Sequence, residues 1–134
     1  MNYIPNYCYS NNQDLRDITV PEDICEIGVG AFSGCINLES VRLNEGLKRL
    51  KKEVFSGCVN LREINIPESV ESIGEWAFRG CKSLKVLRIP GSVKEICAEA
   101  FLDCPEIVIM AEEGTCAAEF AAQMGIPLEV TGRA

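Results

Sequence analysis

Residues 61–83, LREINIPESVESIGEWAFRGCKS, are one copy of a unit that repeats along this chain of 134 residues. The same pattern of apolar, small and polar positions returns every 23 residues, over four copies without an insertion. The repeat is clearest at two positions, which hold Phe32, Phe55, Phe78 and Phe101, and Cys35, Cys58, Cys81 and Cys104. A fixed period of this length is typical of a solenoid, in which each repeat forms one coil that stacks on the next.

Each repeat contains two extended segments and one tight turn. Residues 61–66 predict a strand with one buried face, and Pro67 ends it because proline has no amide hydrogen to donate. A shorter extended segment follows at 70–73, and residues 76–80 predict a single helical turn closed by a left-handed Gly80. A unit this short predicts parallel strands stacked coil on coil, so the fold class is a repeat solenoid, mainly β with short helical turns. We expect the main strands near residues 17–20, 40–43, 63–66 and 86–89.

The N-terminal end departs from the pattern gradually. Residues 1–14 predict a degenerate coil, in which Tyr9 stands one period before Phe32, and atypical polar end units are common in solenoids. Residues 15–110 hold the repeats, with a fifth strand at 107–110.

The C-terminal end predicts a cap of a different kind. Residues 111–134 contain an alanine-rich helix over 115–124, which Gly125 ends, and a short strand at 128–130. We expect this helix to close the open end of the core, so that residues 1–134 form a single domain.

Composition narrows the classes of function. The chain contains no histidine, which excludes Ser-His and Cys-His catalysis and the usual catalytic zinc sites. The net charge of −7 argues against a nucleic acid as the main partner. We therefore expect no enzyme, no catalytic residue, no cofactor and no metal.

The sequence constrains the cellular location of the protein less closely. No segment has the length of a membrane span, so no membrane insertion is expected, and the first residues lack the basic and apolar regions of a secretory signal. The chain is expected to be cytoplasmic or the mature part of an exported protein.

The eight cysteines do not form an obvious disulfide framework. Four of them occupy one position of successive coils, where free cysteine packs as a small hydrophobe, and this favours buried thiols over disulfides or metal ligands. Cys25 falls in an otherwise polar position and is predicted to be the most exposed thiol.

The repeat resembles the BspA-like leucine-rich repeat family, a bacterial type with 23-residue units. The resemblance rests on the pairs Ile66-Pro67, Ile73-Gly74, Ala77-Phe78 and Gly80-Cys81, and it extends over about residues 15–110. It implies a right-handed leucine-rich repeat superhelix of about five parallel-strand coils with a C-terminal capping helix. It also implies protein binding without catalysis, usually by the concave sheet and usually at the bacterial surface or after secretion.

The candidate partner-binding residues lie where the copies disagree. Outward positions of the main strands form two columns, and arginine is a residue type enriched in binding hot spots. The alternative is that these charges only keep the sheet solvated. The candidates on the strands are Thr19, Ser40, Arg42, Glu63, Asn65, Val86 and Arg88.

Trp76 is a further candidate, in a polar position of the tight turn. An exposed tryptophan there would be an anchor for a partner, whereas a folded-over one would pack against its own neighbours.

The leading hypothesis is a non-enzymatic protein-binding module, surface-exposed or secreted, whose ligand is a protein of unknown identity. The alternatives are a structural spacer in a larger surface protein and an intracellular protein-interaction domain. The sequence does not decide the oligomeric state.

Overall fold

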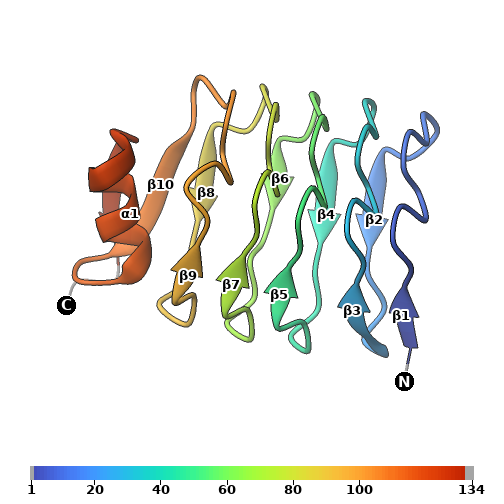
Figure 1. Ribbon diagram of the computed structural model, residues 1–134, viewed down its shortest axis with the longest axis horizontal. Coiled ribbons are helices and arrows are strands. Elements are labelled where there is room, and N and C mark those ends of the chain that lie inside the picture. The colour runs from blue at the N-terminus through green and yellow to red at the C-terminus, as the bar shows by residue number, and fades with distance from the viewer. Residues whose placement is uncertain (1, 132–134) are drawn as a thin grey trace.

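The computed structural model describes residues 2–131 and confirms the expected solenoid (Figure 1). It has about six turns, where the sequence predicted about five, and a single helix lies at the C-terminal end. Residue 1 and residues 132–134, which belong to the predicted domain, lie outside the described residues.

The main strands stack in parallel, one from each coil, at the predicted positions. They are β2 (Asp17–Thr19), β4 (Ser40–Arg42), β6 (Glu63–Ile64), β8 (Val86–Arg88) and β10 (Val108–Glu112). The ladders run β2-β4-β6 and β8-β10-β11, where β11 (Leu128–Thr131) is the predicted last strand. Residues one period apart face each other across the ladder, as Thr19 faces Arg42, so the repeat in sequence becomes a row in space.

A second row of short strands forms the next side of each coil, as expected. These strands are β1 (Asn2–Ile4), β3 (Ile24–Ile27), β5 (Arg49–Leu50), β7 (Ser72–Ile73) and β9 (Glu95–Ile96). Strand β1 was not predicted; it pairs in parallel with β3 and adds a strand to the degenerate N-terminal coil.

The tight turns differ from the expectation. Residues 76–80 form consecutive hydrogen-bonded turns rather than a helical turn, because alternate amides bond the next coil instead of their own segment. The Phe55 amide donates to the Ala77 carbonyl at 2.8 Å, and the Phe78 amide to the Ala100 carbonyl at 2.9 Å. The predicted left-handed closure by Gly80 is confirmed, with φ 72°.

An aromatic stack runs along the core. Neighbouring rings of Phe32, Phe55 and Phe78 lie 5.6 Å apart between centroids, and Tyr9 continues the stack at 5.4 Å from Phe32. At the other end Phe101 meets Phe120 at 6.0 Å. The stack places one ring in each coil and joins the degenerate first coil to the C-terminal cap.

Helix α1 (Cys116–Met124) carries Phe120 and covers the last coil (Figure 1). Thr115 caps its N-terminus by accepting a hydrogen bond from the Ala118 amide, and Gly125 ends it with φ 69°. Phe120 is buried, whereas Met124, one turn later, is exposed. The helix therefore closes the core, as the sequence predicted.

The four repeated cysteines are buried thiols, as predicted. Each Sγ donates to the carbonyl of an aromatic residue in the preceding coil, for example Cys58 to Phe32 at 3.2 Å and Cys81 to Phe55 at 3.3 Å. Burial raises the pKa of the Cys58 thiol to about 12. The prediction for Cys25 was wrong: it is half-buried and donates to the Asn2 carbonyl because β1 covers it.

Candidate functional site

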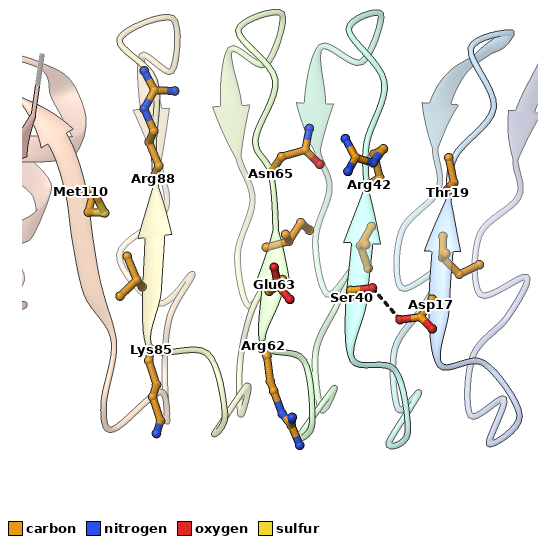
Figure 2. Close-up of a pocket in the computed structure, with 14 residues that line it drawn as sticks. Asp17, Thr19, Ser40, Arg42, Arg62, Glu63, Asn65, Lys85, Arg88 and Met110 are labelled. Carbon is orange, nitrogen blue, oxygen red and sulfur yellow. Dashed lines mark hydrogen bonds between the residues drawn. The ribbon is translucent and has the colours of Figure 1, made fainter.

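The outward side chains of the main strands line one groove (Figure 2). The alternation of each strand turns one residue in two away from the core, and the parallel register sets equivalent residues side by side. The groove has a volume of about 650 Å³ and is called the main-strand groove below. Its lining includes all seven strand candidates, Thr19, Ser40, Arg42, Glu63, Asn65, Val86 and Arg88.

The groove is also lined by residues that were not predicted as candidates, among them Arg62, Lys85 and Met110. Arg62 and Lys85 precede their strands by one residue. Figure 2 shows both at the end of the groove opposite to Arg88, with their side chains pointing away from it. These two residues occupy the same position of successive repeats, directly before the main strand, and that recurrence of a basic residue is the sequence signal for them. Met110 faces Arg88 in the ladder and is half-buried.

The charge of the groove is opposite to that of the chain. Four basic side chains line it against two acidic ones, Asp17 and Glu63, although the whole chain carries −7. Within residues 2–131, none of the five ion pairs involves Arg42, Arg62 or Arg88. Lys85 lies 4.0 Å from Glu106, with both side chains exposed. The guanidinium groups therefore have donors available for a ligand.

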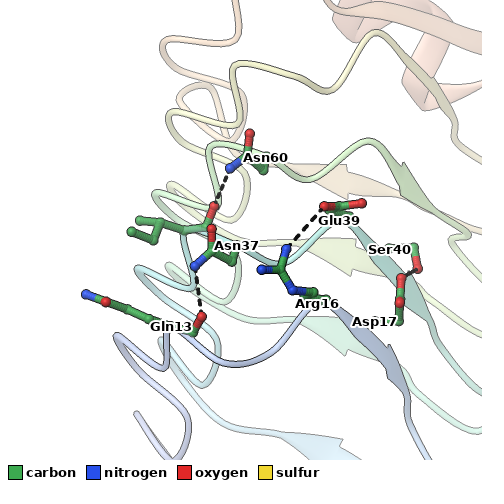
Figure 3. A network of polar contacts seen from close by, with 8 residues as sticks. Gln13, Arg16, Asp17, Asn37, Glu39, Ser40 and Asn60 are labelled. Atoms are coloured by element: carbon green, nitrogen blue, oxygen red, sulfur yellow. Dashed lines mark hydrogen bonds and ion pairs between the residues drawn. The ribbon is translucent and has the colours of Figure 1, made fainter.

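Polar contacts connect neighbouring coils in and beside the N-terminal half of the groove (Figure 3). Arg16 pairs with Glu39 at 3.7 Å, and the Ser40 hydroxyl donates to the Asp17 carboxylate at 2.7 Å. The side-chain amide of Asn37 donates to the Gln13 carbonyl at 2.8 Å. These groups satisfy one another, so the cations without an ion pair in the described structure lie over β4, β6 and β8.

Asn65 has a structural role in addition to its place in the groove. Its side-chain oxygen accepts from the Leu43 amide at 2.8 Å, and its nitrogen donates to the Leu43 carbonyl at 3.2 Å. The amide thus links two coils where the backbone ladder between β4 and β6 has ended.

Trp76 lies outside the groove. Its ring is contacted by Lys52 at 5.4 Å and Arg79 at 5.0 Å from the centroid, and its Nε1 donates to Glu99 at 3.2 Å. The side chain is half-buried. These contacts favour the packing interpretation over that of an anchor.

Other kinds of site find little support in the described part of the chain. Residues 2–131 contain no group of three or more Cys, Asp or Glu side chains placed to hold a metal ion. No helix among them is long and apolar enough to cross a membrane.

Comparison with known proteins places this geometry in a family. The model of the BspA type leucine rich repeat region matches residues 2–113 in six copies. No curated protein sequence matches the chain.

Several solved bacterial structures are similar. A leucine rich cell surface protein from Faecalibacterium prausnitzii is 28% identical with a TM-score of 0.81, over 99% of this chain and 34% of that chain. The leucine rich repeat protein of T. pallidum is 32% identical with a TM-score of 0.79, over 82% of this chain and 52% of that one. A leucine-rich repeat protein from Bacteroides ovatus is 32% identical with a TM-score of 0.78, over 83% of this chain and 29% of that one.

The chain therefore spans between 29% and 52% of the length of these three structures. The repeat match covers most of the chain, and its six copies agree with the fold of about six turns. The chain belongs to the BspA-type leucine-rich repeat family.

Proposed function

We propose that this domain is a non-enzymatic protein-binding module that recognises a protein ligand through the main-strand groove. The observation that carries the proposal is a set of three arginines, Arg42, Arg62 and Arg88, that form no ion pair within residues 2–131 and lie on or directly before the stacked strands. Arginine is enriched among the residues that dominate binding energy, and a rigid ladder reduces the entropy lost on binding.

We also propose that the domain acts at the bacterial surface or after secretion, as part of a longer protein. The similarity to the cell surface protein of F. prausnitzii supports this location. The similar solved structures are also longer chains, of which this domain matches a part.

The test is binding of the purified domain to a panel of extracellular-matrix and host cell-surface proteins, measured by biolayer interferometry. For any partner found, Arg42→Ala combined with Arg88→Ala is expected to weaken binding at least roughly tenfold. Lys48→Ala combined with Arg49→Ala is the matched control, because it removes the same charge from the neighbouring side of the coils. Equal loss in both double variants, or loss in neither, would contradict recognition by the groove.

A further inference from the structure

We infer that the main-strand groove, over β4, β6 and β8, binds an acidic, extended protein segment that also carries an apolar side chain. This inference rests on the proposed function and specifies the chemistry of the partner.

The sign of the charge is the first argument. Arg42, Arg62 and Arg88 are exposed along this part of the groove and form no ion pair within residues 2–131, whereas Lys85 lies 4.0 Å from Glu106. Glu63 is the one acidic side chain of the groove beside them in the described structure. Charge-assisted hydrogen bonds from guanidinium to carboxylate are among the strongest polar contacts, and the three guanidinium groups take part in none of the ion pairs among residues 2–131. A positive groove in a protein of charge −7 therefore selects acidic side chains locally.

The spacing of the arginines along the groove fits an extended ligand. Arg42 and Arg88 occupy the same repeat position two coils apart, so their backbones are separated by about 10 Å, twice the usual strand spacing. In a polyproline II segment, every third side chain points the same way and lies about 9 Å further on. An extended segment lying across the strands, with an acidic residue at every third position, matches the two arginines.

An apolar surface lies next to the cations and fits an apolar side chain of the ligand. Val86 is 48% exposed although it is a strand residue, and Met110 is half-buried beside Arg88. A partner with an apolar side chain next to its carboxylates would cover both.

The same observations disfavour a polyanion such as a nucleic acid or a sulfated glycan. Asp17 and Glu63 interrupt the groove, and the negative charge of the remaining surface repels a long anion. A short protein segment places its carboxylates only where the cations are.

The experiment uses fluorescence anisotropy with a labelled nonapeptide, three repeats of glutamate-proline-valine. Two control peptides replace glutamate with glutamine or with lysine. We expect the glutamate peptide alone to bind, more weakly as salt rises, because screening reduces the attraction between exposed charges. Arg42→Gln combined with Arg88→Gln should weaken binding at least roughly tenfold, whereas Lys48→Gln combined with Arg49→Gln should leave it within about twofold.

Each other outcome contradicts the inference. No binding of the glutamate peptide up to about 1 mM, or equal binding of the glutamine peptide, excludes an acidic ligand. Heparin or single-stranded DNA binding more tightly than the peptide, with loss in the Arg42/Arg88 variant, identifies a polyanion site instead. If a protein partner found by the panel depends on the groove but not on its own acidic residues, only the acidic chemistry is wrong and the proposed function stands.

Discussion

Asn65 holds the backbone of Leu43 with both atoms of its side-chain amide, so one exposed polar residue takes the place of two ladder hydrogen bonds between coils. The residue predicted to contact a partner is thus also part of the scaffold, and it holds the backbone directly after Arg42.

Replacing this amide should therefore lower stability. Asn65→Ala is expected to reduce the free energy of unfolding by about 1 kcal/mol, because two net hydrogen bonds are lost at a partly solvated site. Urea denaturation followed by circular dichroism measures the change. Thr19→Ala, in the same row of the groove, serves as the control and should change stability by less than about 0.5 kcal/mol. Equal effects of the two substitutions would show that the Asn65 amide contributes nothing.

Asn44 occupies the position at which three other coils have proline, yet restoring proline should destabilise the protein. Its side-chain nitrogen donates to the Pro21 carbonyl at 2.7 Å and the Ile24 carbonyl at 2.8 Å, and its oxygen accepts from the Gly46 amide at 2.8 Å. The side chain is buried, so Asn44→Pro leaves these groups without their partner, at a cost of about 2–3 kcal/mol. Thermal unfolding tests this. A variant as stable as the natural chain would mean that water replaces the amide fully.

At position 76 a glycine variant should be more stable than an alanine variant, which is the reverse of the usual order. The φ of Trp76, 59°, lies in the left-handed region, where a side chain is strained and glycine is not. Trp76→Gly and Trp76→Ala both remove the ring, so their difference isolates the backbone. We expect the glycine variant to be more stable by about 1 kcal/mol in chemical denaturation.

The same pair of substitutions at Arg49, in strand β5, provides the control for Trp76 and should favour alanine. A more stable alanine variant at Trp76 would indicate that the backbone relaxes once the ring is gone.

The buried thiols predict a loss of stability in alkali. The pKa of Cys58 is raised by burial from 9.0 to about 12, so the folded state keeps the proton that the unfolded state releases above pH 9. The stabilising contribution is complete below pH 9 and decreases as pH rises toward 12, by about 2 kcal/mol at pH 10.5.

Comparing the natural chain with Cys58→Ala isolates this contribution, because other titrating groups are common to both. The difference in unfolding free energy, measured by urea denaturation at pH 7, 9 and 10.5, should shrink or change sign at the highest pH. A constant difference would contradict a raised pKa.

The sequence was sufficient for features in which every coil repeats the same chemistry. Phe78 and Cys81 return at fixed spacing because each must meet its equivalent in the neighbouring coil, so their burial follows from the period alone. The main strands were predicted for the same reason, since alternation in each copy agrees with stacking between copies.

Features that depend on contacts between dissimilar positions were not predicted. Asn65 resembles any exposed polar residue until its amide is seen against Leu43. The turns around Trp76 form no helix because their amides bond the next coil, a preference that helix-forming residues do not encode. Cys25 is covered by β1, whose sequence carries no repeat signal.

The aromatic stack has a consequence for the order in which the protein opens. Tyr9 is 38% exposed at one end of the stack, whereas Phe120 is 6% exposed and covers the other. In a linear array each coil is held only by its neighbours, so opening starts where one neighbour is missing. We therefore expect unfolding to begin at the N-terminal end. Amide hydrogen exchange should be fastest in the first coil and slowest around Phe55 and Phe78.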